Sequence, residues 1–150
     1  MADTFSQIYI HIVFAVKHRE RSIQSEWKEE LFKYIQGVVK GQRMKIYAIN
    51  GMSDHIHILI SMRPDISISK ITAEIKANSS KWINERKLGK GVFRWQAGYG
   101  AFSCAKSAVP SVARYIENQE THHKEKTYSK EFVKLLKENN VEYEEKYLFD

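Results

Sequence analysis

The segment 54–60 constrains the fold most strongly, because isoleucine occupies every second position in it from Ile56 to Ile60. Successive side chains of a strand point to opposite faces of a sheet, so the isoleucines would share one face and His55 and His57 the other. We therefore predict a strand that buries one face in the hydrophobic core and presents two imidazoles on the other.

The imidazoles of His55 and His57 suit adjacent corners of one metal's coordination shell, because they would project in parallel from neighbouring pleats. A structural zinc site takes four nitrogen or sulfur ligands, and the chain offers one cysteine, Cys104, and no second close pair of ligands. An open catalytic site therefore fits better than a closed zinc site. A solvated pair of histidines on a sheet surface is the alternative that this pattern leaves open.

The composition is that of a globular chain with an excess of positive charge. Its 150 residues suffice for one domain with its own core, and 43% of them are hydrophobic and 28% charged. No apolar run approaches the roughly 20 residues that span a bilayer, and the first residues lack the basic start and apolar core of a signal peptide. We expect a single domain, residues 1–150, in the cytoplasm, with no membrane partner. The formal net charge of +6 favours polyanionic partners such as nucleic acids.

Hydrophobic periodicity over residues 1–104 alternates between strand and helix patterns. The order strand, helix, strand, strand, helix, strand is that of a ferredoxin-like (RRM-like) α+β sandwich with an antiparallel sheet. In this fold the first and third strands are central. The histidine strand would then lie in mid-sheet, with both helices on its isoleucine face and the other face left for a site or a partner. The expected strands are residues 5–16, 45–50, 54–60 and 93–104, the last with an irregular or bulged centre where Gly98 and Gly100 relax the backbone. The expected helices are residues 25–39 and 67–86.

Residues 105–150 depart from this plan and predict a C-terminal helical region, with a helix that begins near Pro110 and a shorter one at 130–139. Tyr115 and Gln119 lie four positions apart, so on one helix their side chains share a face. If that helix crosses the histidine face, the Gln119 amide oxygen completes a three-ligand set for a hard divalent ion, with the Tyr115 phenol beside it as a nucleophile. From spacing alone, Tyr115 is more often a half-buried packing residue.

A tyrosine nucleophile beside a divalent ion suits cleavage of a phosphodiester. A neutral phenol attacks poorly, so a metal that polarises the scissile phosphate does most of the catalytic work. The attack yields a 5′-phosphotyrosine and a free 3′ hydroxyl, and the covalent intermediate keeps the energy needed to join a second strand end without ATP. The sequence is consistent with a reaction that uses no ATP, because the Gly-Lys-Gly segment at 89–91 lacks the spacing of a nucleotide-binding loop.

Four motifs in order carry a resemblance to a known family. They are Tyr9-x-His11-x-Val13-Phe14, Asp54-His55-Ile56-His57, residues 95–103 (WQAGYGAFS) and residues 115–123 (YIENQETHH). Together they resemble the single-tyrosine transposases of small bacterial insertion sequences, of the insertion sequence 200/605 type, within the superfamily of His-hydrophobic-His (HUH) endonucleases. The resemblance covers nearly the whole chain, and four motifs at family spacing are far more specific than one.

The resemblance implies a DNA transposase that acts on single strands, recognises hairpins and cuts and rejoins strand ends with Mg²⁺ or Mn²⁺. It implies a homodimer in which the tyrosine helix of one subunit completes the histidine site of the other. By residue, His55 and His57 match the metal-binding pair, Tyr115 the nucleophile and Gln119 the third metal ligand. A domesticated or non-catalytic protein that binds single-stranded or hairpin nucleic acid is the alternative with the same fold.

Several other residues have roles that the sequence leaves open. His11 would line the site or pack between strands, and Gly98, Gly100 or the segment 105–109 would give the tyrosine helix its hinge. A charged helix face such as the one that carries Lys76 is usually only solvated. On charge and placement alone, the candidates for contact with DNA phosphates are Lys17, Arg19, Arg21, Lys76 and Arg94.

Overall fold

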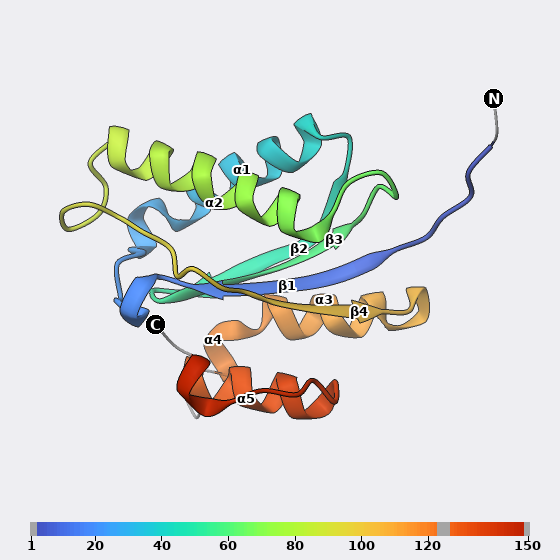
Figure 1. The fold of residues 1–150 in the computed structure, drawn as a ribbon. Helices are drawn as coiled ribbons and strands as arrows, with labels where there is room; N and C mark the ends of the chain where they lie inside the picture. The colour runs from blue at the N-terminus through green and yellow to red at the C-terminus, as the bar shows by residue number, and fades with distance from the viewer. Residues whose placement is uncertain (1–2, 123–126, 149–150) are drawn as a thin grey trace.

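The chain forms a four-stranded antiparallel sheet with helices on both of its faces (Figure 1). The computed structural model describes residues 3–122 and 127–148, except for the side chain of His122. No helix within these ranges is both long enough and apolar enough to cross a membrane. The strands are β1 (Tyr9–Ala15), β2 (Lys45–Met52), β3 (His55–Ser61) and β4 (Gly100–Cys104). The helices are α1 (Ser25–Gly41), α2 (Ile68–Glu85), α3 (Val109–Glu117), α4 (Gln119–His122) and α5 (Tyr128–Glu138), with 3₁₀ turns η1 (Lys17–Arg19), η2 (Lys106–Ala108) and η3 (Glu145–Tyr147).

The strand order of the sheet is β2-β3-β1-β4, so the histidine strand β3 is central, as predicted. β1 lies beside it, with Ala15 opposite His55 and Val13 opposite His57. Gly51 allows β2 and β3 to approach closely at their hairpin, because a Cβ there would lie 2.2 Å from the carbonyl oxygen of His55. The order and the antiparallel pairing confirm the ferredoxin-like α+β fold.

α1 and α2 cover the isoleucine face of the sheet (Figure 1). Hydrophobic residues recur every three or four positions in both helices, so each helix turns one apolar stripe towards the strands. α2 begins after Ser67, whose side-chain oxygen accepts a hydrogen bond from the Lys70 N–H. The two stripes and the inward isoleucines of the sheet form one core. Its fully buried members include Ile12, Leu31, Ile35, Ile56, Ile58, Ile71 and Ile75.

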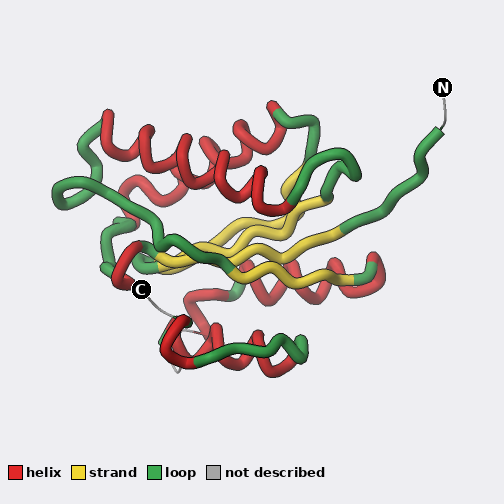
Figure 2. The backbone as a smooth tube through the Cα atoms, in the orientation of Figure 1, coloured by secondary structure: helices red, strands yellow, loops and turns green. Residues whose placement is uncertain are grey.

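α3, α4 and α5 cover the opposite face of the sheet, so that the histidine face is filled rather than left open (Figures 1 and 2). The physical reason is that Val13, Ala15 and Leu59 also point to this face. An uncovered face would expose their apolar surface to water. The residues that cover them are Ile116 of α3 and Tyr128, Phe132, Leu135 and Leu136 of α5.

The fourth strand is shorter than the predicted range 93–104, because β4 begins only at Gly100. The segment before it keeps one antiparallel bridge to the end of β1, between Val16 and Trp95, with backbone hydrogen bonds from Lys17 to Arg94 and from Gln96 to Ala15. Side-chain groups make further contacts with this segment. The Gln96 side-chain oxygen accepts the backbone N–H of Ala15 at 2.6 Å. The Lys76 ammonium donates to three carbonyl oxygens of the same segment at 2.9, 3.3 and 2.8 Å. The prediction of one strand over the whole range is therefore wrong, whereas the irregular stretch between the bridge at Trp95 and the start of β4 at Gly100 agrees with the irregular centre expected there.

Gly100→Ala should weaken the packing of α5 on the sheet. A Cβ at Gly100 would lie 2.7 Å from the Phe132 ring and 3.1 Å from Val13. Because the surroundings are closely packed, we expect a loss of about 1–3 kcal/mol in the free energy of unfolding, measured by chemical denaturation.

Gly98→Ala is the matched control for this substitution. A Cβ at Gly98 would meet no atom within 4 Å, so we expect a change of less than about 0.5 kcal/mol. Equal stability of the two variants would show that α5 does not rest against Gly100.

Candidate active site

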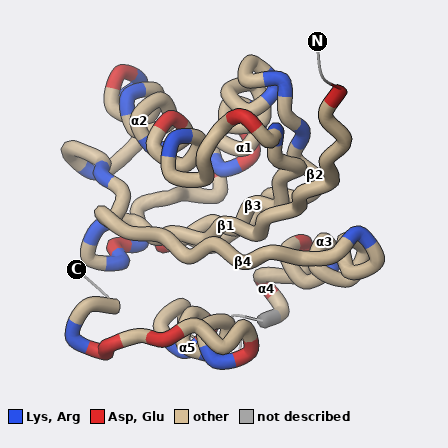
Figure 3. The backbone as a smooth tube through the Cα atoms, turned by 45° about the vertical axis from the view of Figure 1, so that its right-hand side comes forward, with Lys and Arg blue, Asp and Glu red and all other residues tan. Residues whose placement is uncertain are grey.

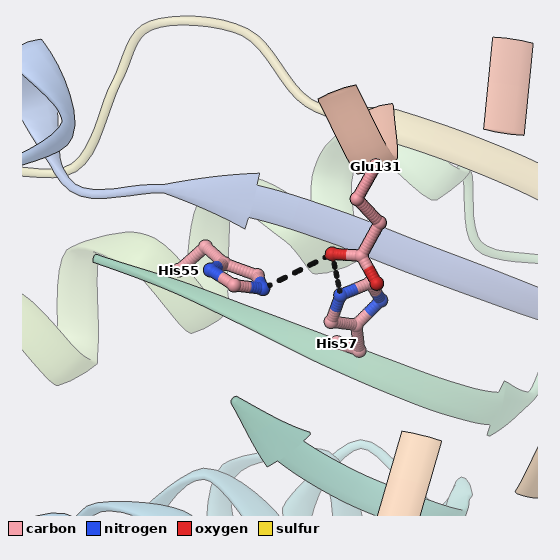
Figure 4. A group of neighbouring side chains, drawn as sticks. All are labelled: His55, His57 and Glu131. Atoms are coloured by element: carbon pink, nitrogen blue, oxygen red, sulfur yellow. Dashed lines mark hydrogen bonds and ion pairs between the residues drawn. The ribbon is translucent and has the colours of Figure 1, made fainter. Parts of the chain in front are cut away.

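His55 and His57 lie side by side on β3, and both imidazoles are fully buried. Their ring centroids are 5.1 Å apart. The Nε2 atoms of both rings face the same carboxylate oxygen, Oε1 of Glu131, at 3.3 Å from His55 and 3.1 Å from His57 (Figure 4). The alternation of β3 therefore turns both imidazoles to one point between the sheet and the helical layer.

Glu131 of α5 completes a group of three potential metal ligands, and sequence reasoning missed it. Its side chain is buried, and one ligand atom from each of Glu131, His55 and His57 lies within 4.8 Å of the others. A signal for it exists in the sequence, because Glu131 interrupts the apolar stripe that Tyr128 and Leu135 share on α5. A carboxylate on the buried face of a helix needs partners, and here the two imidazoles are among them.

Tyr115 and Gln119 contact the second oxygen of the Glu131 carboxylate, Oε2, whereas the two imidazoles face Oε1. The Tyr115 hydroxyl donates a hydrogen bond to Glu131 Oε2, and the Gln119 amide donates to the same oxygen at 3.1 Å. The Oε1 atom of Gln119 lies 3.2 Å from His55 Nε2. The structure thus brings the two histidines, the phenol and the amide together within one chain.

The prediction of one continuous helix through Tyr115 and Gln119 is wrong. α3 ends at Glu117, and α4 begins at Gln119 after Asn118 has left the helical conformation (φ −95°, ψ 26°). The side chain of Asn50 on β2 donates to the Glu117 carbonyl oxygen at 2.9 Å and so satisfies the end of α3. The break is short, and the Gln119 amide still lies 3.5 Å from the Tyr115 carbonyl oxygen. The two side chains therefore keep a common direction.

The second nitrogen of each buried imidazole also has a partner. Asp54 Oδ1 lies 2.7 Å from His55 Nδ1, and His11 Nε2 lies 2.8 Å from His57 Nδ1. Both rings are therefore held through Nδ1, with Nε2 turned towards the Glu131 carboxylate. Metal-binding histidines use this arrangement, because a hydrogen bond at one nitrogen orients the other towards the ion.

Burial and neighbouring charges shift the protonation of three groups. Burial opposes the charged form of His55, but hydrogen bonds to Asp54 and Glu131 outweigh it and raise its pKa to about 9. Burial lowers the pKa of His11 to about 3. Burial also raises the pKa of the Tyr115 phenol, and the Glu131 carboxylate raises it further. Near neutral pH the metal-free site therefore holds a charged His55, a neutral His11 and a neutral phenol.

Tyr128, the first residue of α5, also packs beside the histidine pair. Its ring lies over the His55 imidazole, with ring centroids 4.6 Å apart. Its hydroxyl donates to the Gln96 side-chain oxygen at 3.3 Å, the same oxygen that accepts the Ala15 N–H. Sequence reasoning assigned neither Gln96 nor Tyr128 a role, because only the fold brings these distant positions beside the histidine strand.

A cavity of about 210 Å³ lies beside Tyr115, between β4, α3 and α5. Its lining includes His11, Ser103, Tyr115 and Asn139, so polar groups face it next to the phenol. A concave space beside a candidate nucleophile is the default location for a substrate group.

Four of the five predicted cationic contacts lie at one end of the sheet. Lys17 and Arg19 belong to η1, directly after β1, and the Lys17 N–H donates to the Arg94 carbonyl oxygen at 2.9 Å. Arg19, Arg21 and Arg94 are exposed. Figure 3 shows several Lys and Arg positions along the backbone at the left end of the sheet. Because β1 and β3 are antiparallel, this is also the end at which β3 begins with His55. The basic group and the histidine pair therefore share one end of the sheet.

The remaining predicted residues, which are Lys76 and the two candidate hinge glycines, lie outside the basic group. Lys76 lies apart from the basic group, and its ammonium holds the carbonyl oxygens that precede β4. Gly100 is buried and Gly98 is exposed, and neither adopts a left-handed φ, so backbone conformation marks neither as a hinge. His123 and the side chain of His122, at the end of the fourth motif, lie outside the described part of the chain.

Comparison with known proteins identifies the family. The family model described as "Transposase IS200 like" matches residues 4–119, which include the whole sheet and α3. The ISDra2 transposase TnpA of Deinococcus radiodurans is 22% identical over 126 residues, which cover 79% of this chain and 87% of that protein. The transposase for insertion sequence element IS200 of Salmonella typhimurium is 26% identical over 125 residues, which cover 79% of this chain and 81% of that protein.

Solved structures share the fold at low sequence identity. The crystal structure of a putative transposase from Deinococcus radiodurans R1 has a TM-score of 0.62 at 18% identity, and the match covers 79% of this chain and 95% of that one. A REP-associated tyrosine transposase bound to a REP hairpin has a TM-score of 0.61 at 15% identity, with 82% of this chain and 74% of that one covered. Since the family model spans well over half of the sequence, the chain belongs to the IS200-like transposase family.

Proposed function

We propose that this transposase cleaves and rejoins single-stranded DNA at ends marked by hairpins, with a divalent metal ion and a tyrosine nucleophile. One observation carries the proposal: the phenol of Tyr115 and the imidazoles of His55 and His57 meet at a single buried carboxylate, that of Glu131. Phosphodiester transfer with a bound metal requires a nucleophile, ligands and a proton acceptor within reach of one point.

Mg²⁺ or Mn²⁺ would be held by Nε2 of His55 and His57 and by oxygens of Gln119 and Glu131. Carboxylate and amide oxygens are the ligands that these ions prefer, and the two imidazoles add nitrogen ligands already oriented through Nδ1. The burial of Glu131 supports the fit, because a buried carboxylate is stabilised by a cation beside it. When bound, the ion supplies Lewis acidity at a phosphate oxygen.

The Tyr115 hydroxyl would lose its proton to Glu131 Oε2, the atom to which it already donates a hydrogen bond. As this proton passes, the phenolic oxygen forms a bond to phosphorus. The bond from phosphorus to the 3′ oxygen breaks, and the 3′ oxygen takes up a proton from water. The 5′ side of the strand then stays joined to Tyr115 as a phosphotyrosine.

Joining would run the same chemistry in reverse. The 3′ hydroxyl of another strand end gives its proton to the solvent, which restores the proton taken from water during cleavage, as its oxygen forms a bond to phosphorus. The bond from phosphorus to the Tyr115 oxygen breaks. The phenol then recovers its proton from Glu131, so that the site returns to its starting state. The covalent bond keeps the energy of the cut phosphodiester, and the reaction needs no ATP.

DNA would lie at the end of the sheet that carries the basic group Lys17, Arg19, Arg21 and Arg94. Cations gathered on one surface bind phosphates through electrostatic attraction and counterion release. Their place beside the start of β3 would guide a strand towards the histidine pair, and the cavity beside Tyr115 would take the nucleotide next to the scissile phosphate. The REP hairpin bound by a protein of the same fold supports a hairpin as the recognised element.

We also propose a homodimer in which α3 of one subunit serves the site of the other, as the family resemblance implies. In the single chain Tyr115 reaches Glu131 of its own subunit, so exchange requires α3 to leave this contact. The turn η2 before α3 and the break at Asn118 after it provide two joints about which the helix would turn.

Tyr115→Phe should abolish the covalent adduct between the protein and a hairpin-bearing single strand in Mn²⁺. Without the hydroxyl no phosphotyrosine forms, whereas the ring of phenylalanine keeps its packing beside His11 and His57. Denaturing gel electrophoresis of protein with labelled DNA detects the adduct.

Tyr128→Phe is the matched control, because Tyr128 is the other phenol beside the histidine pair. Its hydroxyl donates to the Gln96 side-chain oxygen, so the adduct should persist near the wild-type level when that hydroxyl is removed. An adduct with Tyr115→Phe would sink the assignment of the nucleophile. Salt-sensitive hairpin binding by the wild type with no adduct in any divalent metal would favour the non-catalytic alternative.

Binding of Mn²⁺ should release a proton from His55 near neutral pH. Its pKa of about 9 means that the metal-free imidazole is charged there, and the proton on Nε2 must leave before the metal binds. The apparent affinity should therefore weaken as the pH falls below about 9, by at most about tenfold per pH unit. Titration calorimetry in two buffers of different ionisation enthalpy counts the protons released.

Asp54→Asn is the comparison for this experiment. Asp54 is the neighbour that contributes most to the raised pKa of His55, so the variant should release fewer protons at the same pH. Equal proton release from variant and wild type would contradict this role of Asp54.

Removal of the exposed basic group should lower the salt dependence of hairpin binding. Arg19, Arg21 and Arg94 replaced together by alanine should weaken binding, because fewer phosphates are then neutralised by the protein. The slope of log affinity against log salt should fall by about 0.7–0.9 for each phosphate that the variant leaves unneutralised. Fluorescence anisotropy with a labelled hairpin over a salt series measures both quantities.

The matched control removes three exposed lysines from α1 and α2, the helices that cover the isoleucine face of the sheet. Lys33, Lys70 and Lys81 replaced by alanine change the net charge by the same amount and should leave the slope close to wild type. If both triple variants behave alike, the effect is one of net charge and DNA does not bind at the end of the sheet.

A further inference from the structure

His11 of β1 lies in direct contact with one of the two candidate metal-binding histidines. It is only 5% exposed, and its ring stacks on that of His57 with centroids 5.1 Å apart and an interplanar angle of 28°. Its Nε2 lies 2.8 Å from His57 Nδ1. The two residues belong to neighbouring strands, in which His57 pairs with Val13, so the contact runs diagonally across the sheet.

The chemistry of a histidine ligand explains why such a contact matters. A neutral imidazole that binds an ion through Nε2 carries its proton on Nδ1, and this N–H needs an acceptor when it is buried. For His55 the acceptor is the Asp54 carboxylate. For His57 the atom in the corresponding place is Nε2 of His11, 2.8 Å from Nδ1.

His11 has the properties that this task requires. It is buried, and the neutral form of an imidazole has one ring nitrogen that accepts a hydrogen bond. If Nε2 accepts from His57, the proton of His11 lies on Nδ1, and His11 lines the cavity beside Tyr115 where this N–H can meet water or DNA. Both nitrogens are then satisfied without any charge on the ring.

We propose that His11 is a positioning residue that accepts the Nδ1–H of His57 and thereby presents Nε2 of His57 to the divalent ion. This inference rests on the proposed function, because it supposes that His57 binds a metal. The competing role for His11 is packing alone, for which its neighbours Phe102 and Tyr115, at centroid distances of 6.0 and 6.2 Å, would be the partners.

The test compares His11→Gln with His11→Asn, two amides that differ in reach. The side-chain oxygen of glutamine extends about as far from Cβ as Nε2 does and can accept from His57, whereas that of asparagine extends only about as far as Nδ1. We expect His11→Gln to keep the Mn²⁺ affinity of the wild type within about threefold. His11→Asn should weaken it by about 10- to 100-fold. Electron paramagnetic resonance of free Mn²⁺ gives the affinities, and circular dichroism confirms that both variants are folded.

A second measurement needs no variant. In the wild type with Mg²⁺, ¹⁵N NMR of the imidazoles should show His57 protonated at Nδ1 and His11 unprotonated at Nε2. A His57 protonated at Nε2 in saturating Mg²⁺ would overturn the proposal, because that nitrogen could not then be a ligand.

The outcomes separate this inference from the proposed function. If the wild type binds Mn²⁺ and His11→Asn binds it equally well, or both variants lose the same affinity, His11 only packs and the metal site stands. If the wild type binds neither Mn²⁺ nor Mg²⁺, the metal-dependent function fails and the role of His11 fails with it.

Discussion

The buried carboxylate of Glu131 is the group on which the assembly of the site depends. An ionised carboxylate removed from water is strongly unfavourable unless charged or hydrogen-bonding partners surround it. Here the partners come from three other elements: the imidazoles of β3, the phenol of α3 and the amide of α4. α5 can bury this carboxylate against the sheet only when its partners on β3, α3 and α4 are in place. The packing of α5 and the assembly of the candidate catalytic groups therefore depend on each other.

The two faces of the central strands have different roles: one forms the main core and the other carries the candidate site. The isoleucine face joins α1 and α2 in the main core, whereas the other face mixes small apolar residues with His11, His55 and His57. Burial strengthens every electrostatic interaction at the site, because little water is present to screen it. The same burial limits access, because the imidazoles of His55 and His57 have no exposed surface, and the cavity beside Tyr115 borders the helical layer that covers them.

The hydrophobic pattern of the sequence was sufficient to predict the topology of the sheet but not the residues at which helices and strands begin and end. The alternation in 54–60 and the order of strand and helix patterns predicted the topology correctly, because periodicity depends on local geometry and on which face is buried. The predicted fourth strand was too long and the predicted tyrosine helix too continuous. Both boundaries depend on distant side chains: Lys76 holds the segment before β4, and Asn50 binds the carbonyl oxygen at the end of α3.

By itself the sequence determined the family, the strand that carries His55 and His57, and the candidacy of Tyr115 and Gln119, because residue type and spacing along a strand or helix are local properties. Only the tertiary structure decided that Glu131 lies between the imidazoles and the phenol and that a third histidine stands behind the pair. A buried polar group is stable only where the folded chain supplies its partners. No local pattern records which distant residues those partners are.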